Sequence, residues 1–132
     1  CMKFQPDQFG SAITSYGSGW IAVAGERIDR SVVLHSTGER TDWRCSHFDE
    51  LPDAHFAPLA AHKPELVVFG SGAATRFPRP AWIRALIEAG IGVEAMDTGA
   101  ACRTYNILAG EGRRVIAALL LEPGEESQDG LK

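Results

Sequence analysis

The residues best suited to chemistry lie in one stretch near the carboxyl terminus, Gly90–Leu121. Its thiol, Cys102, follows Asp97 by five residues and directly precedes Arg103. A thiolate is a nucleophile, and a neighbouring cation or a helix amino terminus lowers the pKa of a thiol. One hypothesis is therefore an enzyme or redox protein in which Cys102 attacks and Asp97 positions a substrate. The alternative, favoured by the two alanines before Cys102, is that the thiol packs in the hydrophobic core.

Asp97 and Thr98 stand between a predicted strand and a predicted helix, where polar side chains have a structural use. Either side chain can accept a hydrogen bond from an amide of the first helical turn, which has no partner within the helix. Capping accounts for both residue types, and acid-base chemistry is the alternative. Cys102 and Asp97 are therefore candidates for catalysis, and no catalytic residue is assigned.

A second glycine-rich turn, Gly70–Gly72, follows the apolar run Leu66–Phe69. Glycines after a buried strand allow backbone amides to approach a phosphate or another oxyanion. The dinucleotide-binding pattern fails at its third glycine, where Thr75 stands, so a tight exit from the strand is the favoured interpretation. Arg76 and Arg79 keep a weaker hypothesis open, in which this loop binds a small anion or an acidic partner.

Residues that commonly bind metals occur in the middle of the chain, at Cys45, His47, His55 and His62. A cysteine and a histidine separated by one residue do not match a structural zinc spacing. The two later histidines share a face only if the segment around Pro58 is helical. We therefore expect loop or surface histidines, with no metal site and no cofactor.

The first third of the sequence predicts antiparallel strands. Short β-rich runs separated by glycine-containing turns are typical of hairpins or a meander, and the runs are Ala12–Tyr16, Trp20–Ala24 and Ser31–Leu34. The next segment, Ser36–Asp42, is polar, and we expect another extended piece to begin at Trp43. A short helix is expected to start near Pro58, because proline is tolerated in a first helical turn.

The second half predicts two strand-helix units and a last strand. Their ranges are Leu66–Phe69, Pro80–Ala89, Gly92–Met96, Gly99–Ala109 and Val115–Glu122. A right-handed crossover makes the first two of these strands parallel, so the turns after them meet at one edge of the sheet, where ligands commonly bind. The predicted ligand or partner crevice at this edge comprises Gly70, Ser71, Gly72, Arg76, Asp97, Thr98, Arg103 and Asn106.

Helical spacing also predicts which side chains face the core. In the helix Pro80–Ala89 the apolar stripe consists of Trp82, Ile83, Leu86 and Ile87. In the helix Gly99–Ala109 it consists of Ala101, Tyr105 and Leu108, which leaves Arg103, Thr104 and Asn106 pointing towards the crevice or solvent.

Composition limits the class of protein. A chain of 132 residues with 45% apolar residues fits one α/β domain, expected over residues 1–123, with a flexible acidic tail over 124–132. The net charge of -4 and the scattered basic residues lack the positive patch of a nucleic-acid-binding protein. No apolar run approaches the ~18 residues that span a bilayer. Three widely spaced cysteines indicate a reducing compartment, and we expect the cytoplasm.

Three strings of residues resemble a known family: VVFGSG at 67–72, GIGVEAMDTGAACRTYNIL at 90–108 and EGRRVIAALL at 111–120. They are similar to the small domain-of-unknown-function family that includes mitochondrial complex I assembly factor 3 and the adipogenesis-associated domain protein of animals. The resemblance covers residues 4–123 and implies a three-layer single domain. A central mixed sheet is expected to have helices on one side and an antiparallel β-meander on the other. No established enzyme activity carries over, and the eukaryotic branch implies protein assembly around a respiratory complex.

Two functional hypotheses follow. The leading one is a non-catalytic binding or assembly module, a monomer or weak homodimer, whose crevice docks an unknown protein segment or a small anionic ligand. The alternative is a small enzyme or redox protein that uses Cys102, with Asp97 or Thr98 positioning a substrate. In that case the backbone amides of Gly70–Gly72 would hold an oxyanion.

Overall fold

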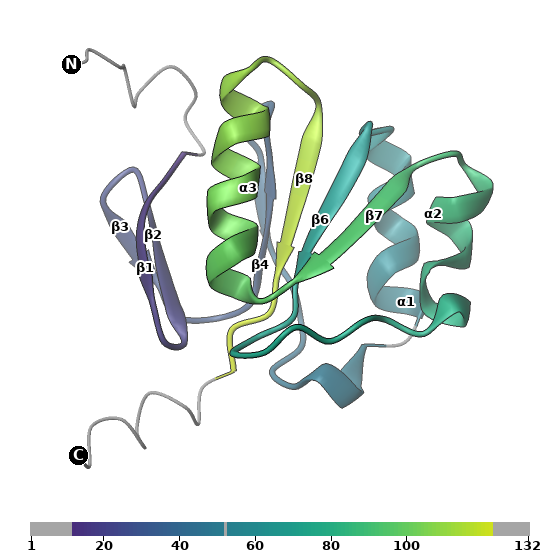
Figure 1. Ribbon diagram of the computed structural model, residues 1–132, viewed down its shortest axis with the longest axis horizontal. Coiled ribbons are helices and arrows are strands. Elements are labelled where there is room, and N and C mark those ends of the chain that lie inside the picture. The colour runs from purple at the N-terminus through teal and green to yellow at the C-terminus, as the bar shows by residue number, and fades with distance from the viewer. Residues whose placement is uncertain (1–11, 52, 123–132) are drawn as a thin grey trace.

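The chain forms two sheets within residues 12–51 and 53–122, which a computed structural model describes (Figure 1). The predicted acidic tail, 124–132, lies outside these ranges. The smaller sheet contains β1 (Ile13–Gly17), β2 (Trp20–Val23) and β3 (Glu26–Ile28). The larger sheet contains β4 (Val32–His35), β5 (Arg40–Asp42), β6 (Leu66–Gly70), β7 (Gly92–Met96) and β8 (Val115–Leu119).

Helical segments connect and cover the strands of the larger sheet. The α-helices are α1 (Asp53–Phe56), α2 (Arg84–Glu88) and α3 (Thr98–Gly110), and the 3-10 helices are η2 (Phe48–Glu50), η3 (Ala57–His62) and η4 (Pro80–Ile83). Within the part of the chain that the structure describes, no helix has the length and apolar character needed to cross a membrane.

The smaller sheet is an antiparallel meander in the order β1-β2-β3. Its third strand, β3, lies where the sequence predicted a connection. Ala24 and Gly25 both have positive φ, at 52° and 86°, and form the two-residue turn that folds β3 back onto β2. The run Ser31–Leu34, predicted beside these strands, instead supplies β4 of the larger sheet, paired with β8.

The larger sheet is mixed, in the order β5-β4-β8-β6-β7. β6 runs parallel to both β7 and β8, which confirms the predicted parallel pair, whereas β4 is antiparallel to β8 and β5. β5 lies within the polar segment Ser36–Asp42, for which the sequence predicted no strand. The predicted extended piece at Trp43 is wrong, because the strand ends at Asp42, one residue before it.

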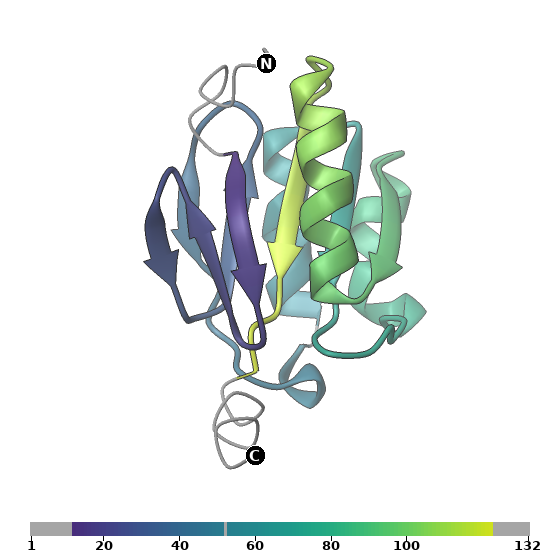
Figure 2. The same ribbon diagram turned by 60° about the vertical axis from the view of Figure 1, so that its left-hand side comes forward.

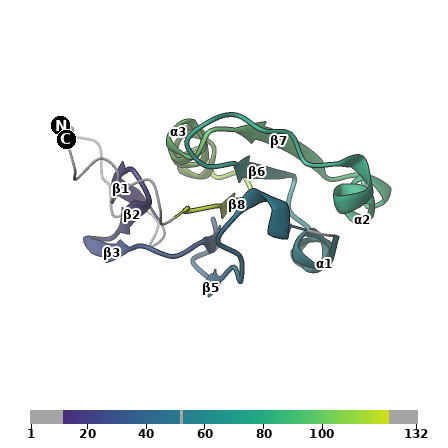
Figure 3. The same cartoon turned by 90° about the horizontal axis from the view of Figure 1, so that it is seen from below.

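The helices are divided between the two faces of the larger sheet. α3 and the meander cover one face, where Ile21, Val68 and Tyr105 share a buried cluster. α1, η3 and α2 cover the other face, around Phe56 and Phe69. Figure 3 shows the two sides seen from below, and Figure 2 shows the meander beside α3.

The chain is thus a single mixed α/β domain with a mixed sheet, an antiparallel sheet and helices, as the fold class predicted. The helices were expected to lie together on the face opposite the meander, but α3 lies on the same face as the meander. The handedness of the crossovers explains this difference. The connection through α2 moves one strand outwards, from β6 to β7, and the connection through α3 returns to β8 on the far side of β6. Right-handed crossovers in opposite directions place their helices on opposite faces.

The core stripe predicted for the helix at Pro80–Ala89 is only partly correct. Leu86 is fully buried, and Trp82 and Ile83 pack partly against the same cluster, but Ile87 is 56% exposed. The segment begins as the 3-10 helix η4 before α2 starts at Arg84, and the tighter 3-10 turn shifts the side chains out of uniform α-helical spacing.

We predict that Leu86→Ala lowers the free energy of unfolding by about 2–5 kcal/mol, because it leaves a cavity in the core. Ile87→Ala, the neighbouring change on the exposed side, is expected to cost less than about 1 kcal/mol. Urea denaturation followed by circular dichroism measures both values. Equal losses in the two variants would contradict the orientation of α2.

Candidate functional site

A crevice of about 280 Å³ lies at the carboxyl edge of the parallel strands. Three predicted site residues, Gly72, Asp97 and Thr98, contribute to its wall. The rest of the lining comes from the β1-β2 turn, the turn after β6, the start of α3 and the exit from β8. It consists of Tyr16, Gly17, Ser18, Gly19, Ala73, Gly99, Leu120, Leu121 and Glu122. The turns that follow β6 and β7 therefore meet at one edge of the sheet, as their parallel arrangement predicted.

Asp97 and Thr98 have different structural roles in the crevice wall. Asp97 caps α3, since its Oδ2 accepts a hydrogen bond of 3.1 Å from the amide of Ala100, and this confirms the capping interpretation. Thr98 is buried, and its hydroxyl accepts a 2.9 Å hydrogen bond from Gly72 N and donates one of 2.9 Å to Leu120 O. The hydroxyl of Thr98 thus joins the exits of β6 and β8 to the start of α3.

The glycine-rich turn directs its amides into the protein. The amide of Ser71 donates a hydrogen bond of 2.8 Å to Met96 O, and the amide of Gly72 donates one to the hydroxyl of Thr98. A Cβ at Gly70 would stand 3.0 Å from Cα and Oγ1 of Thr98, so this glycine permits the close approach of the two segments. The turn therefore serves as a tight exit from β6, and the two amides cannot hold an oxyanion without breaking these bonds.

Arg76 is likewise engaged within the protein. Its guanidinium donates to Ser71 O at 2.6 Å and forms an ion pair of 2.7 Å with Glu122, while it lies 4.9 Å from the ring centre of Phe48. Ser71 is fully buried, and its hydroxyl accepts a 2.8 Å hydrogen bond from the amide of Arg76. An anion at this loop would compete with the carboxylate of Glu122 for the guanidinium.

Arg103 and Asn106 do not line the crevice, although they were predicted there. The carboxamide of Asn106 accepts a hydrogen bond of 2.9 Å from Ile13 N and donates one of 2.7 Å to Ile13 O. Arg103 donates to the hydroxyl of Tyr16. Both side chains connect α3 to β1, because the meander packs beside this helix.

Cys102 is 1% exposed and packs in the cluster between α3, the meander and the sheet. Burial raises the pKa of its thiol to about 12, against the opposing effect of Arg103, and Asp97 adds to the increase. The thiol is therefore protonated at neutral pH, and the neutral form is a poor nucleophile. These properties match the packing interpretation and give no support to the enzyme or redox alternative.

The residue types considered for metal binding separate in the structure. Cys45 is buried, His47 is exposed, and His55 Nε2 lies 2.8 Å from the carbonyl of Arg44. His62 instead lies beside His35 and Glu39 at the other end of the sheet. No local pattern in the sequence marks His35 and Glu39 as partners of His62, because the cluster forms only when a β-turn and η3 come together.

The fold and the crevice invite comparison with known proteins. A family model described as a protein of unknown function (DUF498/DUF598) matches residues 13–120. A bovine protein named NADH dehydrogenase (ubiquinone) 1 alpha subcomplex assembly factor 3 is 34% identical over 114 residues, covering 85% of this chain and 61% of the relative. This chain thus spans about three fifths of the length of that relative.

Bacterial proteins match over more of their length. An uncharacterised protein of Rhodobacter capsulatus is 36% identical over 113 residues, covering 85% of this chain and 86% of the relative. The crystal structure of a Bordetella parapertussis protein superimposes with a TM-score of 0.79 at 38% identity, covering 89% of this chain and all of that one.

We predict that Asn106→Ala lowers the free energy of unfolding by about 1–2 kcal/mol, because it leaves the amide and carbonyl of Ile13 without their partner. The matched control is Ile107→Ala, at the next position of α3, whose side chain is 61% exposed. It is expected to change stability by less than about 0.5 kcal/mol. Chemical denaturation of the two variants makes the comparison, and an equally small loss in Asn106→Ala would contradict this role.

The burial of Cys102 predicts slow reaction with a maleimide at neutral pH. We expect the peptide that contains Cys102 to be labelled much more slowly in the native protein than in urea, because the native thiol is both covered and protonated. Mass spectrometry of the digested protein resolves this peptide from those of the other cysteines. Labelling of the native thiol at the denatured rate would revive the nucleophile hypothesis.

Proposed function

This chain belongs to the family of proteins of unknown function DUF498/DUF598, and we propose that it is a non-catalytic docking module in the assembly of a larger complex. The name of the bovine relative supports this role, and it makes a subunit of NADH dehydrogenase the proposed partner. The internal pairing of the crevice residues and the protonated thiol of Cys102 also favour binding over catalysis.

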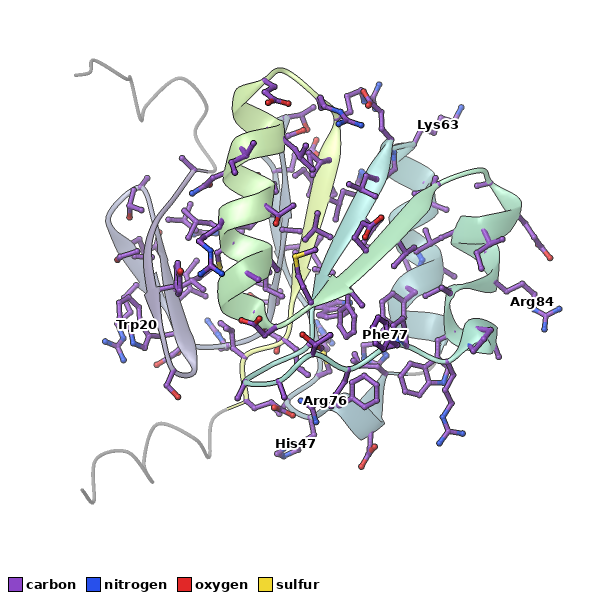
Figure 4. All side chains as sticks on the ribbon, viewed as in Figure 1. Trp20, His47, Lys63, Arg76, Phe77 and Arg84 are labelled. Carbon is purple, nitrogen blue, oxygen red and sulfur yellow. The ribbon has the colours of Figure 1, made fainter. Side chains whose placement is uncertain are left out.

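One observation carries the proposed docking surface: Phe77 is 73% exposed in the loop that joins β6 to η4. Arg76 and Arg79 flank it in the sequence, and Arg79 lies 5.8 Å from the ring centre of Trp82. Figure 4 shows Phe77 and Arg76 at the same edge of the molecule as the carboxyl ends of the strands. Exposed aromatic and arginine side chains together are typical of the residues that contribute most to protein-protein binding.

The local charge indicates the chemistry of the partner. Residues 71–84 contain three arginines and neither Asp nor Glu, although the whole chain has a net charge of -4. Glu122 neutralises Arg76, whereas Arg79 and Arg84 are exposed. We therefore propose a protein segment that places an apolar side chain on Phe77 and acidic side chains near Arg79.

A small anionic ligand is less well supported at this edge. The amides of Ser71 and Gly72 are already bonded within the protein, and the guanidinium of Arg76 is paired with Glu122. A small anion would have to replace these interactions, whereas a protein segment could bind to Phe77 and leave them intact.

We also propose that the chain acts in a reducing compartment, such as the cytoplasm predicted from the cysteine content. Within the described residues, Cys45 and Cys102 are both buried and neither forms a disulfide. Disulfides are uncommon where cellular reductants keep thiols reduced, so these two cysteines agree with this location.

Photo-crosslinking tests the docking surface. A photoreactive phenylalanine analogue at position 77 is expected to form adducts with a subunit of NADH dehydrogenase in the native cell, identified by mass spectrometry. The added substitution Arg79→Glu is expected to reduce their yield, because it places a negative charge opposite the acidic partner. The same analogue at position 107 is the control, since Ile107 is also exposed but lies on α3. Equal adducts from both positions, or none from position 77, would contradict the proposal.

A further inference from the structure

A second cavity, of about 370 Å³, lies at the opposite end of β8 from the crevice. Its wall includes His35, Glu39, His62 and Arg114. Lys63, which follows His62 directly, marks this end of the molecule at the top of Figure 4. The cavity therefore lies apart from the loop that carries Phe77, and an inference about it does not rest on the proposed docking function.

Two imidazoles and a carboxylate meet at this cavity. Nδ1 of His35 and Nδ1 of His62 each lie 3.9 Å from Oε1 of Glu39. The two imidazole rings have centroids only 4.1 Å apart, at an interplanar angle of 61°. One potential ligand atom from each of the three residues lies within 4.8 Å of the other two.

The two separations that involve Glu39 are near those of a metal-binding geometry. Ligand atoms at ~2.0–2.1 Å from a tetrahedral ion stand ~3.3 Å from one another. The two contacts to Glu39 need to shorten by only about half an ångström to reach this value. Glu39 and His62 are largely exposed at the side chain, at 65% and 46%, so they are able to move towards His35.

The backbone holds the three residues in place around the cavity. His35 ends β4, and its amide donates to Glu39 O at 2.9 Å, while Gly38 N donates to His35 O at 2.8 Å. Gly38 has a φ of 111°, a conformation that glycine adopts readily and that closes the turn between His35 and Glu39. Arg114 donates to the carbonyl of His62 at 2.8 Å, which ties the end of η3 to the start of β8.

We propose that His35, Glu39 and His62 form a binding site for a divalent transition-metal ion of the zinc type. Two imidazole nitrogens and one carboxylate oxygen are a donor set that zinc and similar ions accept, whereas magnesium and calcium prefer oxygen ligands alone. Three protein ligands leave a further coordination position, and the cavity has room for a water molecule or a small anion there.

Charged and titratable groups that face this site also influence how strongly it binds an ion. Burial and the neighbouring His62 lower the pKa of His35, and Glu39 opposes them to a smaller extent. The positive charge of Arg114, which also lines the cavity, opposes a cation and favours an anionic group at the remaining position.

Calorimetric titration of the full chain with Zn²⁺ tests the site. We expect one ion to bind per chain at neutral pH. His62→Ala and Glu39→Gln are expected to weaken binding by at least about tenfold, since each removes or neutralises a ligand. Both side chains are largely exposed, so the variants should fold, and circular dichroism checks this.

His47→Ala is the matched control, because His47 is exposed and lies outside this cluster, and it should bind as tightly as the wild type. With Co²⁺ in place of Zn²⁺, ligand-field absorption bands are expected without a thiolate-to-metal charge-transfer band. The proposal is overturned if the wild type does not bind, if His62→Ala and Glu39→Gln bind as tightly as the wild type, or if the cobalt spectrum shows thiolate ligation.

Discussion

The hydroxyl of Thr98 makes the interaction on which the carboxyl edge of the central sheet depends. It accepts a hydrogen bond from the amide after β6 and donates one to the carbonyl after β8, in a buried position. A buried amide or carbonyl without a partner costs about 1–3 kcal/mol, so a single side chain prevents that loss in two strands. Glycine at position 70 avoids a tight contact at the same point, because Cα and Oγ1 of Thr98 lie 3.0 Å from where its Cβ would stand.

The path of the chain through the sheet determines what surrounds this point. Since the crossovers through α2 and α3 run in opposite directions, the sheet is covered on both faces and has two separate buried clusters. The meander then packs beside α3, where Asn106 pairs with the backbone of Ile13. Side chains that an isolated helix would present to solvent thereby form contacts between α3 and β1.

Local patterns in the sequence predicted those parts of the fold that depend on neighbouring residues. The strand Gly92–Met96, the cap at Asp97 and the stripe of Ala101 and Tyr105 all follow from spacing within a few residues. The roles of Arg103 and Asn106 depend on Tyr16 and Ile13, more than 80 residues earlier in the chain, so no helical pattern could reveal them. The same limit applies to His35 and Glu39, whose meeting with His62 requires both β4 and η3 to be in place.

The two ends of β8 consequently differ in chemistry. At its carboxyl end the polar groups are paired with one another, as the contacts of Thr98 and the ion pair of Arg76 with Glu122 show. At its amino end, imidazole and carboxylate side chains border an open cavity. At the carboxyl end these polar groups are already hydrogen-bonded within the protein. A ligand there must therefore bind to the exposed surface around them, which suits a protein contact at Phe77. A ligand at the amino end can bind directly to nitrogen and oxygen atoms, which suits a metal ion.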